Sequence, residues 1–174
     1  MKTMVNEFSE YARAPKLNLE LTDINKLIKE ITHLFENSGI KITTKLSKTM
    51  PEIKIDINMM RQVLINLIQN AQDAIANNIK QSTIQISTNK LKNDLVLSIQ
   101  DNGPGFSVDI LKKAFEPYVT SKSHGTGLGL AIVKRIAELY NAEITLEPSS
   151  FASGTAFTLH FSAIIPVTLD SKQS

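Results

Sequence analysis

The spacing of hydrophobic residues along the chain predicts an alternation of helices and strands. Apolar residues that recur every three or four positions, as on one face of a helix, predict helices at residues 1–14, 24–35, 57–78 and 128–140. Apolar residues at alternate positions predict strands at 17–21, 40–46, 84–86, 95–99, 144–146 and 157–161. Because hairpins and helices are interleaved, we expect an α+β fold in which one mixed sheet has helices packed on one face.

Short polar residues mark the starts of two of these helices. Thr22 or Asp23 can cap the second predicted helix, and Asp56 or Asn58 can cap the third, because their side chains accept hydrogen bonds from free N–H groups of the first turn. Pro15 ends the first helix. That first helix starts without a cap, which fits either the end of a longer helix or an ordinary N-terminal helix.

The third predicted helix carries a polar stripe beside its apolar one. The stripe repeats at spacings of four, four, three and four residues, so its members share one face of the helix. They are Gln62, Asn66, Asn70, Asp73 and Asn77. A solvated face is one interpretation, although such faces usually carry Lys and Glu, which are better helix formers than Asn. Amide oxygens also suit Mg²⁺ that shares its shell with phosphates and water, so both interpretations stay open.

Glycines gather in one long segment with little predicted regular structure. Five of the seven glycines lie between Gly103 and Gly129, and long loops in a compact domain are usually functional. The segment follows Asp101, whose carboxylate can accept a hydrogen bond from an exocyclic amine at the end of a strand. Gly103 and Gly105 let the backbone approach a flat ring closely. Taken alone, the same residues also fit a plain turn.

The glycine-rich segment closes on Gly125-Thr126-Gly127-Leu128-Gly129, where the fourth predicted helix starts. Backbone of this kind at a helix N-terminus offers free N–H groups to phosphate. The segment lacks the Lys-Ser or Lys-Thr that ends a P-loop, and it does not follow a strand as a dinucleotide fingerprint does. Lys122 lies just upstream and could reach a terminal phosphate, although an exposed loop lysine would look the same.

Composition narrows the class of protein. The formal net charge is +2, with Lys and Arg scattered and not interleaved with aromatic residues, so nucleic acid and acidic membranes are not expected partners. The absence of cysteine excludes disulfides and cysteine metal sites and is compatible with the cytoplasm. The sequence has no apolar run of membrane-spanning length and no signal-peptide core at its start. We expect a soluble, cytoplasmic domain without direct membrane contact, whose parent protein could hold membrane spans upstream.

Four segments together resemble the ATP-binding domain of sensor histidine kinases, in the superfamily of DNA gyrase B, Hsp90 and the mismatch-repair ATPases. They are similar to the family's asparagine box, first glycine box, phenylalanine box and second glycine box, in that order: Asn66-Leu-Ile-Gln-Asn70-Ala-Gln-Asp73, Asp101-Asn-Gly-Pro-Gly105, Phe115-Glu-Pro-Tyr118 and Gly125-Thr-Gly-Leu-Gly-Leu130. Each box is a weak signal alone, but four in this order and spacing are specific. Residues 4–13 and 115–129 are most similar to nitrogen-regulation kinases.

The resemblance implies a fold and residue roles. The fold is a two-layer α/β sandwich of the Bergerat type, with a mixed sheet and about three helices. Asp101 would accept from the adenine amino group, and Gly103 and Gly105 would let the loop pass the base. Asn70 would hold the Mg²⁺ that bridges the phosphates, while Asn66 would lie near the γ-phosphate. Asn66 and Lys122 are the expected catalytic residues. The other expected nucleotide contacts are Asp73, Phe115, Tyr118, Gly125, Thr126, Gly127, Leu128 and Gly129.

One difference from the hydrolytic relatives bears on the reaction. Gyrase and Hsp90 carry a water-activating Glu where this sequence has Asn66, and an amide is no general base at neutral pH. We therefore expect poor hydrolysis of ATP, and phosphoryl transfer through positioning and electrostatic stabilisation. Asp73 replaces the basic residue of many histidine kinases, and either a role in the metal's outer shell or simple packing would explain it.

None of the three histidines fits the family's His-Glu or His-Asp acceptor motif. His33 precedes Leu, and His160 alternates with apolar residues as a surface histidine on a strand. His124 falls in the expected lid, where a solvated side chain and a phosphate contact both stay open. We expect a fragment that binds ATP and Mg²⁺ without phosphorylating itself, with the acceptor on a dimerisation domain and the phosphoryl group passing to a response regulator. The alternatives are a stand-alone ATPase and a degenerate regulatory nucleotide-binding domain.

The same resemblance implies three parts of the chain. Residues 1–15 would be the end of a dimerisation-hairpin helix, residues 16–165 the catalytic ATP-binding domain, and residues 166–174 a flexible tail. Because the hairpin provides most of the dimerisation in this family, we expect this fragment to be monomeric. The lid, at about residues 118–126, is expected to be mobile without nucleotide.

Overall fold

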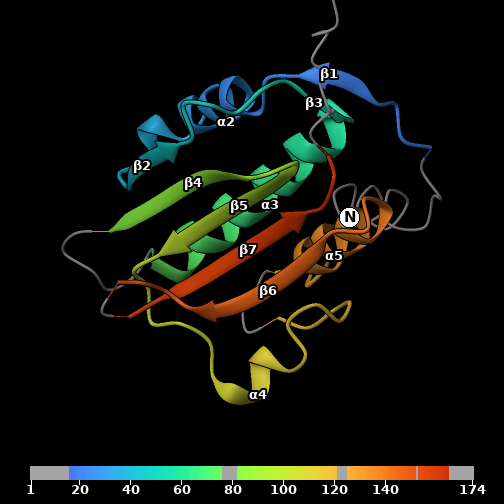
Figure 1. The fold of residues 1–174 in the computed structure, drawn as a ribbon. Coiled ribbons are helices and arrows are strands. Elements are labelled where there is room, and N and C mark those ends of the chain that lie inside the picture. Colours follow the sequence, from blue (N-terminus) through green and yellow to red (C-terminus); the bar gives the residue numbers. More distant parts are fainter. Residues whose placement is uncertain (1–15, 76–81, 121–124, 152, 165–174) are drawn as a thin grey trace, which may run out of the picture.

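A computed structural model describes residues 16–75, 82–120, 125–151 and 153–164 of the chain. Five strands form one mixed sheet in the order β2-β4-β5-β7-β6 (Figure 1). β2 (Lys41–Leu46) runs parallel to β4 (Thr83–Leu91), and every other neighbouring pair is antiparallel. The other three strands are β5 (Asp94–Asp101), β6 (Glu143–Pro148) and β7 (Thr155–Phe161). The predicted mixed sheet is confirmed.

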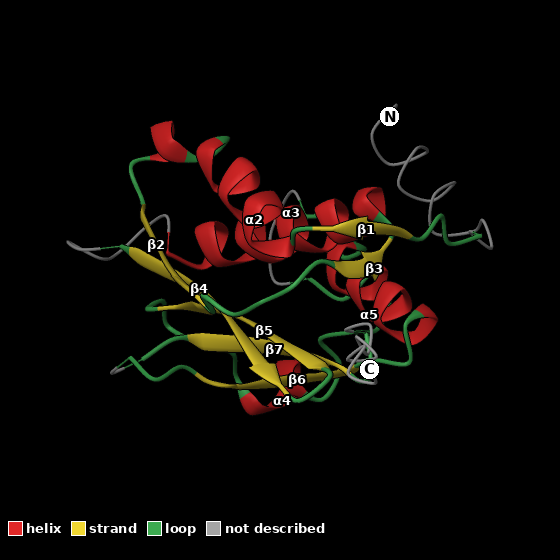
Figure 2. Ribbon diagram, turned by 45° about the horizontal axis from the view of Figure 1, so that its top comes forward, coloured by secondary structure: helices red, strands yellow, loops and turns green. Residues whose placement is uncertain are grey.

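Three helices pack on one face of this sheet and form the second layer (Figure 2). They are α2 (Ile24–His33), α3 (Ile57–Ile75) and α5 (Gly129–Leu139). Each buries a stripe of apolar residues at helical spacing, such as Leu64, Leu67, Ile68 and Ala71 of α3. The predicted two-layer α+β sandwich is therefore confirmed.

Alternation along β5 decides which side chains reach the helical layer. Leu95, Leu97 and Ile99 are buried, and Asp101 continues this buried row at the end of the strand. Because side chains of a strand alternate between faces, Gln100 points to the opposite, open face of the sheet. The carboxylate of Asp101 thus lies at the boundary between the sheet and the helices.

Two aspartates cap the helices, one from each pair of predicted candidates. Asp23 Oδ1 accepts a hydrogen bond from the Lys26 N–H at 3.0 Å at the start of α2. Asp56 Oδ1 accepts from the N–H groups of Asn58 and Met59, at 3.0 and 3.1 Å, at the start of α3. These bonds satisfy donors that have no partner within the helix itself.

Asp56 also joins three parts of the fold. Its second carboxylate oxygen accepts from the Asn18 N–H at 2.9 Å, which fixes the entering chain beside α3. Its own N–H donates to the Tyr140 hydroxyl at 2.7 Å, and Tyr140 follows the last residue of α5. The start of α3 and the end of α5 are therefore tied together at one buried residue.

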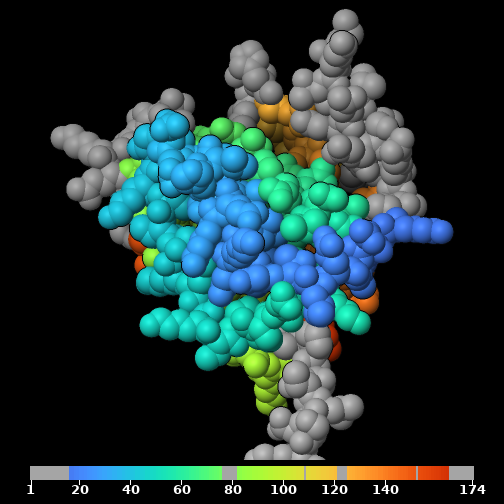
Figure 3. Space-filling model, turned by 90° about the horizontal axis from the view of Figure 1, so that it is seen from above, coloured from blue at the N-terminus to red at the C-terminus, as the bar shows by residue number. Residues whose placement is uncertain are grey.

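Four short elements differ from the sequence prediction. The strand predicted at 17–21 is β1 (Glu20–Thr22), and it pairs with β3 (Ile53–Ile55), which was not predicted. η1 (Glu36–Ser38) and α4 (Val108–Leu111) lie in predicted connections. Figure 3 shows β1 and α2, in blue, on the outer surface of the helical layer. Elements of three or four residues are too short to give a periodic signal.

Some predicted boundaries shift, and others fall outside the described residues. α2 ends at His33 rather than at 35, with Leu34 as its C-cap, and η1 follows from Glu36. The predicted parts 1–15 and 166–174, and the last residues of the third predicted helix, lie outside the described residues. Among the helices that the structure describes, none has the length and apolar character needed to cross a membrane.

Candidate nucleotide-binding site

A cavity of about 1200 Å³ opens between α3, the start of α5 and the long glycine-rich segment. Its walls bring together residues from three of the four motifs that the sequence singled out. The predicted site residues that line it are Asn66, Asn70, Asp73, Gly105, Gly125, Thr126, Gly127 and Gly129. Segments more than 60 positions apart in the chain are thus gathered around one space.

The carboxylate of Asp101 is buried behind the wall at one end of this space, with 2% of the residue exposed. Its Oδ1 accepts hydrogen bonds from the N–H groups of Gly103, at 2.8 Å, and Thr155, at 3.3 Å. Burial raises the pKa of Asp101 above its ordinary value, and the two N–H donors partly oppose that rise. One carboxylate oxygen is thereby fixed by backbone donors.

The loop after Asp101 packs closely against α3 and against the turn between β6 and β7. A Cβ on Gly103 would lie 2.8 Å from Asp101 Oδ1 and 3.4 Å from Ala74 Cβ, so the absence of a side chain leaves room for the carboxylate. Phe106, farther along the loop, lines the cavity and meets Phe157 of the sheet edge-on, with ring centroids 6.2 Å apart. This end of the cavity is therefore partly aromatic.

Gly154 is the tightest glycine of the site. A Cβ on it would overlap the carbonyl oxygen of Asp101 and would lie 3.0 Å from Asn102 Cα. Its φ of +115° is also unfavourable for any residue with a side chain. Only glycine lets the β6–β7 turn lie flat on the end of β5, which brings the Thr155 N–H to Asp101.

At the other end of the cavity, the polar stripe of α3 faces the first turn of α5. A Cβ on Gly129, the first residue of α5, would lie 3.2 Å from Asn66 Oδ1 and 3.7 Å from Asn70 Nδ2. The N-cap residue Leu128 makes no side-chain capping hydrogen bond. Within the described parts of the chain no side-chain cap occupies this helix start, so the N–H groups of its first turn and the positive end of the helix dipole can bind an anion.

Two hydrogen bonds hold described residues of the segment between α4 and α5. The N–H of Tyr118 donates to the carbonyl oxygen of Gly127 at 3.0 Å, and Thr126 Oγ accepts from the Leu128 N–H at 3.4 Å. Tyr118 has a φ of +67°, an uncommon value for a residue with a bulky side chain. Lys122 and His124 lie outside the described residues, so their predicted roles stay predictions.

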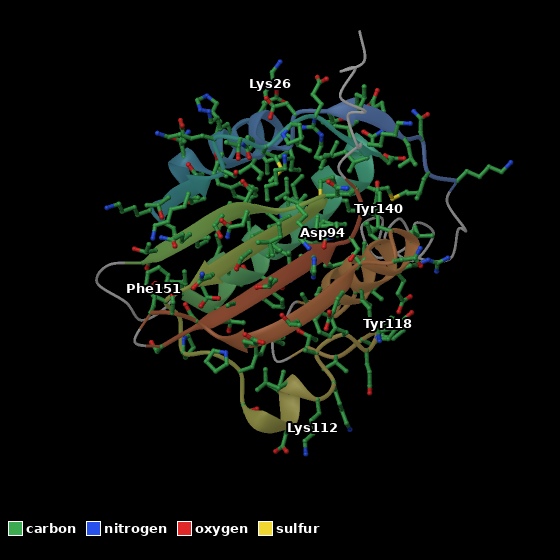
Figure 4. All side chains as sticks on the ribbon, viewed as in Figure 1. Lys26, Asp94, Lys112, Tyr118, Tyr140 and Phe151 are labelled. Carbon is green, nitrogen blue, oxygen red and sulfur yellow. The ribbon has the colours of Figure 1, made fainter. Side chains whose placement is uncertain are left out.

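Five predicted nucleotide contacts do not line the large cavity. Leu128 is fully buried in the core, and Tyr118 is 59% exposed, with its side chain directed outward (Figure 4). Phe115 lines a smaller cavity of about 300 Å³ against the outer side of α5. Asp101 and Gly103 lie beneath the wall that Ala74 and Gly105 form. Their roles towards a nucleotide stay predictions.

The histidines that the structure describes lie away from the cavity. His33 Nδ1 is 2.7 Å from Glu36 Oε1 at the exposed end of α2. His160 Nε2 is 2.9 Å from Asp94 Oδ2, and this half-buried pair lies on the open face of the sheet. Neither imidazole lines the large cavity.

Sequence reasoning missed several residues that shape the site. Gly154 and Thr155 complete the environment of Asp101, and Arg61 and Arg135 line the cavity from facing helices. The pair Gly154-Thr155 at the start of a strand was the available signal, because a glycine before a buried strand often marks a close backbone approach. The arginines gave no such signal, since they sit at ordinary helical positions.

Comparisons with known proteins agree with this geometry. Residues 55–164 match the family described as histidine kinase-, DNA gyrase B-, and HSP90-like ATPase. The chain therefore belongs to this family of ATP-binding domains, as its motifs predicted.

Individual relatives point to the histidine kinase branch. The chain is 33% identical over 166 residues to the nitrogen regulation protein NtrY of Azorhizobium caulinodans, and the match covers 92% of this chain and 21% of NtrY. Full-length ShkA in complex with AMPPNP has a TM-score of 0.79 at 26% identity, covering 91% of this chain and 35% of that chain. Histidine kinase ThkA in complex with response regulator protein TrrA has a TM-score of 0.76 at 26% identity, covering 92% and 46%. The predicted similarity to nitrogen-regulation kinases is confirmed.

Proposed function

We propose that this chain positions Mg-ATP for transfer of the γ-phosphoryl group to a histidine on a separate dimerisation domain, from which it passes to a response regulator. The chain spans 21% of NtrY and 35% of ShkA, so the activity of a whole kinase is part of this proposal. The observation that carries it is a single cavity with a buried carboxylate directly behind its wall at one end and a helix N-terminus at the other.

The spacing along α3 sets the shape of the ligand. Gly129 of α5 lies against Asn66, whereas Gly103 lies against Ala74. These two α3 residues are eight positions apart, which is about 12 Å along a helix axis. A ligand that reaches both ends must be elongated, with a hydrogen-bond donor at the Asp101 end and negative charge at the Gly129 end. A nucleoside triphosphate with an exocyclic amine, as in adenine, has this form.

The donor set fits Mg²⁺. The side-chain amides of Asn66 and Asn70 lie beside the N-terminus of α5, with Asn66 Oδ1 nearest to Gly129, and Asp73 lines the same cavity one turn farther along α3. Hard oxygen ligands in small number suit a magnesium ion that keeps waters and binds substrate phosphates. Among the described residues no group of three or more His, Cys, Asp or Glu side chains could hold a metal ion. Asn70 would hold the ion, which would neutralise phosphate charge when bound.

The residues of the chain would act mainly by binding and orienting the nucleotide. The Asp101 carboxylate would accept from the base amine, and the N–H groups at the start of α5 would bind the phosphates. Asn66 cannot take a proton from water at neutral pH, so the site favours transfer to a supplied nucleophile over hydrolysis. The relatives named above support this reading, with AMPPNP bound by ShkA and a response regulator bound by ThkA.

A calorimetric titration with an ATP analogue and Mg²⁺ tests the binding step. Wild type is expected to bind saturably, and Asp101→Asn is expected to bind about 10- to 100-fold more weakly, as for a lost hydrogen bond to a charged group. Gln85→Asn on the open face of the sheet serves as a control. Absence of binding by a folded wild-type chain would overturn the proposal.

Incubation with ATP and the separately expressed dimerisation hairpin of the parent tests the transfer step. Phosphohistidine on the hairpin supports the kinase reading. Binding without transfer would instead indicate a regulatory domain, and steady-state ATP turnover by the chain alone would indicate an ATPase. Near-stoichiometric phosphohistidine on the isolated chain would contradict the separate acceptor.

A further inference from the structure

We propose that Gln100 is a positioning residue for the base end of the nucleotide site, because its side-chain carbonyl holds the described part of the β6–β7 turn (residues 149–151 and 153–154) that aims the Thr155 N–H at Asp101. This inference rests on the proposed function. Gln100 points to the open face of the sheet, away from the cavity, so it acts on the nucleotide only through the turn.

One atom of Gln100 gathers three donors from the start of the turn. Its Oε1 accepts hydrogen bonds from the hydroxyl of Ser150 at 2.8 Å, the N–H of Ser150 at 3.0 Å and the hydroxyl of Ser149 at 3.4 Å. Figure 4 labels Phe151, the next residue of the turn, at one end of the sheet. The first half of the turn is thus fixed to β5 by a single side chain.

The far end of the same turn is fixed to the next residue of β5. Gly154 packs on the carbonyl of Asp101, and the Thr155 N–H donates to Asp101 Oδ1 at 3.3 Å. A hydrogen bond of 3.1 Å from the Ser149 N–H to the Gly154 carbonyl closes the turn between these two anchors. Two consecutive residues, Gln100 and Asp101, therefore hold one turn from opposite faces of the sheet.

In this arrangement, the hydrogen bonding of the Asp101 carboxylate depends on the position of the β6–β7 turn. The Thr155 bond is at the long end of the usual range, so a small displacement of the turn would break it. That bond also opposes the rise in pKa that burial imposes on Asp101. Without it, Asp101 would be less well oriented and its ionised form less favoured, and both changes weaken a contact to a base amine.

Three substitutions separate positioning from general stability. Gln100→Met keeps the length of the side chain and removes the acceptor, whereas Gln100→Glu keeps an acceptor oxygen. Gln85→Met is the matched control, because Gln85 lies directly opposite Gln100 on β4 and faces the same side of the sheet. The measurements are the dissociation constant of an ATP analogue with Mg²⁺ and the rate of amide hydrogen exchange at Thr155.

Gln100→Met is expected to weaken binding about 3- to 10-fold, as for one lost neutral hydrogen bond, and to speed exchange at Thr155. Gln100→Glu and Gln85→Met are expected to stay near wild type in both measurements. Wild-type affinity and exchange in Gln100→Met would overturn the inference and leave the proposed function intact. A wild-type chain that binds no nucleotide would overturn both.

Ser150→Ala keeps the inference testable if Gln100→Met fails to fold. Ser150 is exposed, and the substitution removes the shortest of the three bonds from the turn side. The same direction of change, smaller in size, supports the positioning role. Unchanged affinity and unchanged exchange at Thr155 in this variant would overturn it.

Discussion

Gly127 lies directly against the backbone of Tyr118. A Cβ on Gly127 would be 2.6 Å from the carbonyl carbon of Tyr118, and the Tyr118 N–H donates to the Gly127 carbonyl at 3.0 Å. Both residues have left-handed backbone, with φ of +68° and +67°. This contact joins the two ends of the segment between them, beside the cavity that contains Asn66 and Gly129.

Gly127→Ala is expected to break this contact and weaken nucleotide binding. The methyl group can be placed only if the backbone of Tyr118 moves, and positive φ adds strain of about 1–3 kcal/mol. Because the chain relieves this strain by leaving the binding-competent arrangement, the dissociation constant for an ATP analogue is expected to rise about 5- to 100-fold. Calorimetry measures this, with urea unfolding to follow stability.

Gly39→Ala is the matched control for that prediction. Gly39 has a similar φ of +75°, but nothing lies within 4 Å of a Cβ there, and it lies outside the cavity. The control is expected to lose about 1 kcal/mol of stability from the backbone alone and to keep wild-type affinity. Equal losses of affinity in the two variants would show that the contact with Tyr118 has no special effect.

Tyr140→Phe is expected to destabilise the fold at the junction of α3 and α5. The substitution removes the acceptor of the Asp56 N–H, which lies 2.7 Å from the Tyr140 hydroxyl at a buried residue. An unpaired buried donor costs about 1–3 kcal/mol. Urea denaturation measures the change in the free energy of unfolding.

Tyr118→Phe provides the comparison for Tyr140→Phe. Its side chain is 59% exposed, so loss of the hydroxyl is expected to change stability by less than about 0.5 kcal/mol. If Tyr140→Phe is as stable as Tyr118→Phe, the hydrogen bond between Asp56 and Tyr140 does not stabilise the contact between α3 and α5.

The long helices and strands were predictable because each repeats its pattern of buried apolar residues several times. α3 presents buried residues at helical spacing over 19 residues, and β5 alternates over eight. β3 has only Ile53 and Ile55 to show, and two apolar residues fit any element. Its strand character comes from pairing with β1, a contact between segments about 30 positions apart that no local pattern encodes.

The sequence predicted those site residues that lie on one face of a single helix. Asn66 and Asn70 share one face of α3, so helical periodicity placed them together. The surroundings of Asp101 were not predictable in this way. The Thr155 N–H reaches it from a strand 54 positions away, and Gln100 acts through a turn on the opposite face of the sheet. Such contacts depend on tertiary packing rather than on local sequence.

Asp101→Asn is expected to stabilise the nucleotide-free protein at neutral pH, even though it weakens binding. Burial raises the pKa of Asp101 above the ordinary 3.8, so the folded protein holds this proton more tightly than the unfolded chain. The contribution of Asp101 to stability is therefore greatest below pH 3.8 and falls as the pH rises through the raised value. Asparagine removes the cost of burying an ionised carboxylate at neutral pH, and its Oδ1 can still accept from the N–H groups of Gly103 and Thr155.

Urea unfolding of the Asp101→Asn variant and of wild type, without nucleotide, tests this at pH 7 and at pH 3.5. The variant is expected to have the larger free energy of unfolding at pH 7, and the difference is expected to shrink at pH 3.5. If Asp101→Asn is less stable than wild type at pH 7, the surroundings favour the ionised carboxylate. The pKa of Asp101 would then not be raised.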